Sequence, residues 1–239
     1  MSENSKFSAL ILGAFLFLGL FVLGYQLAGA VVKFKQFERT VKVKGLSERE
    51  YPADIVIWPI QFTVTGNEIE DVYKSIEQGK QKIQLFLEKH GVETDEISYS
   101  IPFIIDKYAE QYGNQARPEF RYTANQTVTI YSKHIKTVRK VMSSLSELGK
   151  QGIVFTGGGY QTQTEYLFTR LNEVKPEMIE EATRKAREVA IKFASDSKSR
   201  LGKIKSASQG QFSITARDKN NPHIKKIRVV STVVYYLSD

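Results

Sequence analysis

The start of the chain contains an apolar run that constrains everything else. Between Phe7 and Val32 there is no charged residue, and the sequence is FSALILGAFLFLGLFVLGYQLAGAVV. A helix of roughly 20 apolar residues crosses the hydrocarbon core of a bilayer at about 1.5 Å per residue. A buried helix of a soluble domain would keep a polar stripe, and none is present between Ala9 and Gly24. The run therefore predicts one N-terminal transmembrane helix or an export signal.

The two interpretations differ in whether the run is retained. Ala28-Gly29-Ala30 has the A-x-A pattern of a signal-peptidase site and follows a short n-region that carries Lys6. The apolar stretch before it, however, exceeds the about 7–15 residues of an ordinary signal-peptide core. We therefore favour a tail over residues 1–6 and a retained signal anchor over residues 7–32. Cleavage after Ala30 and secretion to the periplasm is the alternative.

The charges that flank the run leave its orientation open. Only Lys6 and the terminal amine precede it, whereas five basic residues follow it within or just after an expected linker over residues 33–39. The positive-inside rule alone would place the large domain in the cytoplasm, but long domains can be translocated regardless of flanking charge. The five residues are Lys33, Lys35, Arg39, Lys42 and Lys44.

The rest of the chain alternates between strand-like and helix-like patterns. From Val56 to Val64, apolar residues recur at every second position, as in a strand with one buried face. Pairs of strands interspersed with helices are typical of an α+β fold with mostly antiparallel sheet and packed helices, in β-α-β-β units. We expect one such domain over residues 40–239. Its strands are expected near 40–46, 55–64, 97–107, 119–131, 162–171, 204–214 and 224–237, its helices near 67–90, 133–148 and 176–201, and a hairpin loop over 108–118.

Several residues suggest where these elements begin and end. Pro59 lacks an N–H group and predicts an edge strand or a bulge. Asn67 is a candidate N-cap, and Gly91 a candidate helix terminator. Pro176 suits the first position of the third helix, and Gly202 the position after its end. The expected buried stripe of that helix contains alanines that would let it pack close to a sheet: Ile179, Ala182, Ala186, Val189, Ala190, Phe193 and Leu201.

No residue pattern points to a reaction. The chain has no cysteine, which removes disulfides, thiol nucleophiles and thiolate metal sites. His90, His134 and His223 are isolated from one another, without the paired spacing of a zinc site. Gly157-Gly158-Gly159 is not followed by the residues of a phosphate-binding loop. We therefore predict no catalytic, cofactor-binding or metal-binding residue and no enzyme activity.

The formal net charge of +8 lies entirely after the apolar run. It is compatible with anionic partners such as phospholipid, nucleic acid or envelope polymers, but the interleaving of both signs of charge along most of the chain favours a solvated surface. No aromatic residue lies between positions 213 and 234, so we expect no specific nucleic acid. Two basic clusters are present: Arg217, Lys219, Lys225, Lys226 and Arg228, and Lys198, Arg200, Lys203 and Lys205.

Motifs in the third helix and the first strands resemble the SIMPL-domain family. The helix carries Ile179-Glu-Glu-Ala182 with further alanines at four-residue spacing, followed by Leu201-Gly202-Lys-Ile204. Three shorter matches precede it, and the resemblance spans about residues 40–239. The segment from Ser195 to Ser199 is more polar than the family pattern. The shorter matches are Val43-Lys-Gly45, Ala53-Asp54 and Tyr122-Thr-Ala124.

The resemblance implies an exported bacterial protein of the periplasm or cell envelope. Members of the family form ring-like or channel-like oligomers in some cases, are loosely linked to stress tolerance, and have no agreed enzymatic activity. We therefore expect a single-pass inner-membrane protein whose large domain faces the periplasm and acts as a homo-oligomeric scaffold or chamber. An anion-binding module for phospholipid or nucleic acid, or an uncharacterised enzyme, is the alternative. The resemblance identifies no small-molecule ligand.

Overall fold

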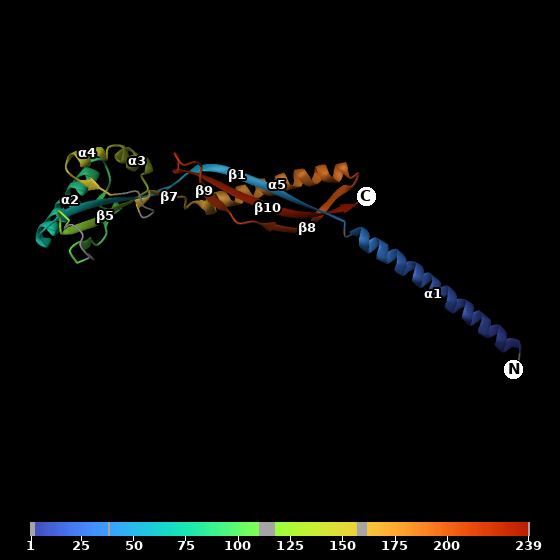
Figure 1. The fold of residues 1–239 in the computed structure, drawn as a ribbon. Coiled ribbons are helices and arrows are strands. Elements are labelled where there is room, and N and C mark those ends of the chain that lie inside the picture. The colour runs from blue at the N-terminus through green and yellow to red at the C-terminus, as the bar shows by residue number, and fades with distance from the viewer. Residues whose placement is uncertain (1–2, 38, 110–117, 157–161, 239) are drawn as a thin grey trace. The chain divides into compact units, whose positions relative to one another are not determined.

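The computed structural model describes residues 3–37, 39–109, 118–156 and 162–238. The chain forms two compact units (Figure 1). Unit 1 comprises Met1–Glu48, Pro176–Phe212 and Arg228–Asp239, and unit 2 comprises Arg49–Lys175 and Ser213–Ile227. We expected one domain over residues 40–239. The periodic patterns locate strands and helices, but they do not show that the strands divide into two separate sheets, each with its own core.

Unit 2 is built on an antiparallel sheet of six strands. Its two long strands, β2 (Ile55–Gly66) and β5 (Tyr122–Ser132), pair from Val56 opposite Ser132 to Gly66 opposite Tyr122. The sheet order is β3-β5-β2-β6, with β4 also on β5 and β7 also on β2. The short strands are β3 (Ile97–Tyr99), β4 (Phe103–Asp106), β6 (Val154–Phe155) and β7 (Glu165–Leu167).

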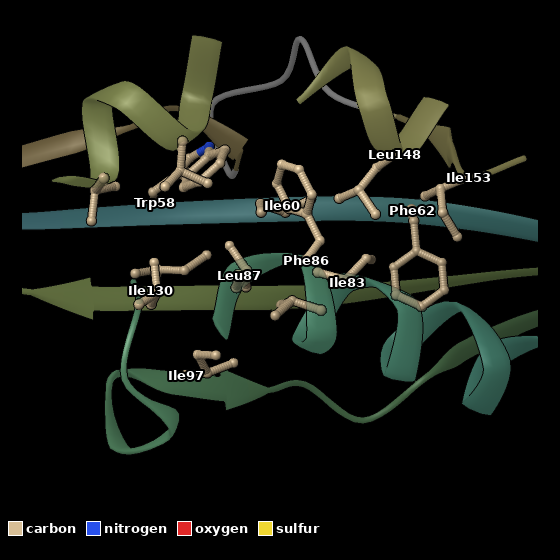
Figure 2. Packing of buried hydrophobic residues seen from close by; sticks show 14 of the residues in the cluster. Trp58, Ile60, Phe62, Ile83, Phe86, Leu87, Ile97, Ile130, Leu148 and Ile153 are labelled. Atoms are coloured by element: carbon tan, nitrogen blue, oxygen red, sulfur yellow. The ribbon is translucent and has the colours of Figure 1, made fainter. Parts of the chain in front are cut away.

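The core of unit 2 lies between this sheet and its helices. The alternate residues Val56, Trp58, Ile60 and Phe62 of β2 are buried, as the period-two pattern predicts. They contact apolar side chains of α2 (Ile69–Lys89), α3 (Ile135–Ser143) and α4 (Ser146–Lys150), as Figure 2 shows. Gly79 of α2 is needed for this packing, because a Cβ atom there would lie 2.7 Å from the Phe62 ring.

Three local expectations in unit 2 are wrong. First, β2 is a central strand and not an edge strand. Pro59 lies opposite Thr129 of β5 on one side. On the other side it lies between the residues of β2 that pair with β7 and those that pair with β6, so no strand of the described residues pairs with it there. Glu68 is the N-cap of α2, and the Asn67 side chain instead accepts a hydrogen bond from the Arg121 backbone N–H at 3.0 Å. The second helix breaks into α3 and α4.

Other expectations in unit 2 are confirmed or untested. Gly91 ends α2 with a φ of 87°, in the left-handed region that glycine adopts at low cost. The strand expected near 97–107 is divided into β3 and β4, with Pro102 between them. The strand expected over 162–171 is reduced to β7, and the helix that follows begins at Leu171, earlier than predicted. The loop over 108–118 lies mostly outside the described residues, and the triple glycine entirely so.

The second sheet, most of whose residues belong to unit 1, has four strands in the order β1-β10-β8, with β9 (Ser213–Ala216) also on β10. Its main strands are β1 (Thr40–Pro52), β8 (Arg200–Gln209) and β10 (Ile224–Ser238). Helix α5 (Leu171–Asp196) packs against it through a buried alanine row. The approach is close, since a Cβ atom on Gly45 would overlap backbone atoms of Ala182 and Ala186. The alanines therefore act as predicted.

The ends and flanks of α5 differ from the sequence-based expectation. Pro176 lies inside the helix, because α5 begins at Leu171. Lys198, with a φ of 52°, takes the left-handed conformation after the helix, and Gly202 instead belongs to β8. Two apolar members of the predicted stripe, Val189 and Phe193, are 38% and 55% exposed. The buried positions are Met178, Ala182, Ala186, Ala190 and Ala194.

Helix α1 (Glu3–Phe37) contains the apolar run. Its segment Leu10–Ala30 is long and apolar enough to cross a membrane, near the N-terminus where a signal sequence would also lie. All side chains described in this segment are exposed in the isolated chain. The helix continues to Phe37, so most of the segment 33–39 that we expected to be a linker is helical.

Candidate binding groove

A groove of about 760 Å³ lies between α5 and β8 within unit 1. It exists because the alanine row of α5 packs against β1 and β10 and leaves β8 uncovered. Apart from the half-buried Leu201, every residue of β8 is exposed. The groove is lined by Glu180, Thr183, Arg184, Arg187, Gly202, Lys203, Ile204 and Tyr235.

The charged groups of the groove are predominantly positive. Arg184 and Arg187 come from one flank of α5, and Lys203 comes from β8, against the single carboxylate of Glu180. Within the described part of the chain, none of these four side chains has a hydrogen-bond or ion-pair partner. All four are exposed. The groove therefore presents three uncompensated cations, which favours an anionic ligand.

The floor of the groove is apolar. Tyr235 of β10 is 3% exposed and belongs to the small core of unit 1. Ile204 of β8 is 50% exposed and faces the same side of the sheet, because it pairs directly with Tyr235. Ile204 therefore offers an exposed aliphatic surface beneath the cations, and the buried Tyr235 lies below it. This arrangement suits binding, since the lining combines positive charge with apolar contact.

The hairpin cluster of basic residues is largely engaged within the chain. The Arg217 Nε donates to Asp218 at 2.8 Å, and its Nη1 lies 3.7 Å from Glu50. Arg228 lies 3.8 Å from Glu48. These partners occupy the cations and favour the interpretation of a paired, solvated hairpin. Of the two basic clusters in the sequence, the structure brings only Lys203 of the second into the groove.

The three histidines have separate structural roles. His90 contacts the Phe86 carbonyl oxygen at 2.8 Å through Nδ1, and His134 lies 3.1 Å from Glu96. The Nε2 atom of His223 accepts from Arg139 at 2.9 Å. Burial, with the nearby charges of Arg139 and Arg217, lowers the pKa of His223 and agrees with a neutral ring in that contact. Over the described residues, no group of three or more acidic or histidine side chains is placed to hold a metal ion.

Lys203 and the α5 pattern are visible in the sequence, but the groove is not. The spacing of Arg184 and Arg187 was a usable signal, because residues three apart lie on one side of a helix. What the sequence could not show was that α5 leaves β8 uncovered. That depends on the close contact at Gly45, which draws the helix towards β1.

The family model for SIMPL, described as a protein of unknown function (DUF541), matches residues 41–233. The chain belongs to the SIMPL family. The match includes most of the strands and helices of both units, and with the apolar helix it fits a membrane-anchored envelope protein. No curated protein matches the chain.

Proposed function

We propose that this SIMPL protein is retained in the bacterial inner membrane by α1, faces the periplasm, and assembles with further copies into a scaffold or chamber. The observation that carries the assembly is the exposure of Val189 and Phe193, at 38% and 55%. These residues follow the helical period of a buried stripe, yet the single chain covers them only in part.

The two side chains form an apolar pair on α5. They are four residues apart, so they lie on the same side of the helix. Fully burying a side chain of this size contributes about 1.5–3 kcal/mol. Covering both against a second copy is a favourable contribution that the isolated chain leaves unused.

Membrane retention supports the same proposal. A helix that holds each copy in the bilayer raises the local concentration of the attached units, so that a modest contact suffices for assembly. The glycines of α1 favour close contact between anchors, because Gly13 and Gly24 carry no side chain that would keep two helix backbones apart. The intact mass of the membrane-extracted protein tests retention, since cleavage after Ala30 would shorten it.

Self-association is tested on the full-length protein in detergent and in lipid nanodiscs, by light scattering after size exclusion. We expect an oligomer that Phe193→Ser weakens. Leu85→Ser is the matched control, because Leu85 is 66% exposed on a helix of unit 2. A strict monomer in both environments would overturn the scaffold proposal, as would equal effects of the two substitutions.

The orientation can be mapped because the chain contains no cysteine. A single cysteine at Ser98 should react with a membrane-impermeant thiol reagent from the periplasmic side. Labelling only after the inner membrane is opened would reverse the proposed topology. We extend the proposal to stress tolerance on the family resemblance alone, and propose no catalytic role, small-molecule cofactor or specific nucleic acid.

A further inference from the structure

We propose that the groove between α5 and β8 captures an extended acidic segment of a partner protein, which adds as a strand to the free edge of β8. The ligand class is a peptide with two carboxylates at alternate positions. The proposal goes beyond self-association, because it rests on different residues from the apolar pair on α5.

The edge of β8 is open for pairing. One side of β8 pairs antiparallel with β10, from Leu201 opposite Leu237 to Gln209 opposite Ser231. Across the described residues, no strand pairs with its other side. The backbone N–H and C=O groups of such an edge form a template that an extended peptide can extend. β8 is ten residues long, which is ample for a short added strand.

The cations of the groove match the spacing of an added strand. Arg184 and Arg187 are three residues apart on α5, so their Cβ atoms are about 5–6 Å apart. On a strand, two side chains on the same face are separated by one residue and lie about 6.6 Å apart. Two carboxylates at alternate positions can therefore meet both guanidinium groups. Glu180, one turn further along α5, disfavours a third carboxylate beyond Arg184.

A second copy of β8 does not suit this edge. Antiparallel pairing of two copies of β8 would concentrate Arg200, Lys203 and Lys205 of both copies on one short ribbon, and the register centred on Ile204 would place Lys203 opposite Lys205. Like charges that face each other across strands are destabilising. Nucleic acid also fits poorly, because the one aromatic residue in the lining, Tyr235, is buried and presents no face for base stacking. An acidic strand satisfies the cations and covers Ile204.

The test measures fluorescence anisotropy with full-length protein in detergent. The probe is a short fluorescein-labelled peptide of threonine and valine with two glutamates separated by one residue. We expect saturable binding that weakens at least about tenfold when Arg187→Glu replaces attraction by repulsion. Lys192→Glu is the control, because it makes the same charge change on the same helix outside the groove lining. Hydrogen exchange should show that both variants remain folded.

Three further peptides separate the possible modes of binding. A version N-methylated at alternate amides should fail to bind, since it cannot pair with β8. Versions with glutamine in place of glutamate, or with adjacent glutamates, should bind weakly. Full binding of any of these peptides, or equal affinity of the Arg187→Glu variant, would overturn the proposal. Absence of peptide binding to the native protein would also overturn the proposal. If the Arg187→Glu variant also lost self-association, the groove would be assigned to a second copy of the chain. Phe193→Ser should keep peptide affinity, so the two proposals fail separately.

Discussion

Both units pack helices against an antiparallel sheet. They differ in the side chains that fill the space between the helix layer and the sheet within each unit. In unit 2 the layers are held apart by bulky side chains such as Trp58, Phe62 and Leu87. In unit 1 the small core contains Val43, Val233 and Tyr235 with two alanines of α5, and the helix backbone lies directly over Gly45.

This difference predicts opposite sensitivities. A side-chain-filled core loses most when a large residue is removed, because a cavity remains. A core formed by backbone approach loses most when a small residue is enlarged, because neither backbone can give way. The narrow core of unit 1 also covers less surface, which leaves β8 and the flank of α5 available for partners.

Removal of the Phe62 ring should give the largest effect. Phe62 is 1% exposed and lies against Gly79. We expect Phe62→Ala to lower the free energy of unfolding of unit 2 by about 3–5 kcal/mol. Hydrogen exchange read by mass spectrometry should show faster exchange in β2 and β5. If α5 and β1 near Gly45 lost protection equally, the two cores would not be independent and the comparison would fail.

Enlarging Gly45 tests the opposite sensitivity in unit 1. The added methyl group of Gly45→Ala would overlap the backbone of α5 at Ala182. We expect a loss of about 1–3 kcal/mol, because the helix must move away from the sheet. Exchange should accelerate in α5 and β10. Gly149→Ala is the control: a Cβ there meets no neighbour within 4 Å, and alanine in a helix should be neutral or stabilising. Equal losses in both variants would argue against the close contact.

The sequence predicted the elements of both units better than their packing. The alternation in β2 and the alanine row in α5 are local periodicities, so they could be recognised without a structure. The exposure of Val189 and Phe193 could not, because it depends on how far α5 is drawn towards β1. The close approach of α5 to β1 also leaves the groove over β8. Its cations were visible as residues, but their lack of partners is a property of the folded chain.

Local sequence signals failed where a distant contact competed. Asn67 has the usual chemistry of an N-cap, yet its carbonyl oxygen accepts from the Arg121 backbone N–H of a distant segment. Pro176 suited a helix start, but α5 begins at Leu171 and includes it. For Asn67, the contact with a segment distant in the sequence decides between the two positions that the residue could take.

A buried hydrogen bond in unit 1 should have a smaller effect than its core. The Ser47 hydroxyl is fully buried and donates to the Glu181 carboxylate at 2.8 Å, which links β1 to α5. Ser47→Ala should cost about 1 kcal/mol, because Glu181 keeps its ion pair with Lys185 at 2.6 Å. Chemical denaturation followed by exchange in α5 measures the loss. A larger loss than that of Gly45→Ala would show that this polar link, rather than the backbone approach, dominates unit 1.

The smallest effect should come from acidification of an exposed turn in unit 2. Hydrogen bonds from Arg217 and from the backbone N–H groups of Asn220 and Asn221 lower the pKa of Asp218 from 3.8 to about 2. Because the folded pKa is depressed, the contribution of Asp218 is fully present above its ordinary pKa and is lost as the pH falls towards 2. An NMR titration of the Asp218 carboxyl should give that low midpoint, and the turn amides should shift with it. In Asp218→Asn the turn amides should not titrate in this range, and both cores should be unaffected. A midpoint near 3.8 in the native protein would mean that the Arg217 contact does not persist in solution. It would also mean that the surface of unit 2, unlike its core, is not fixed by the fold.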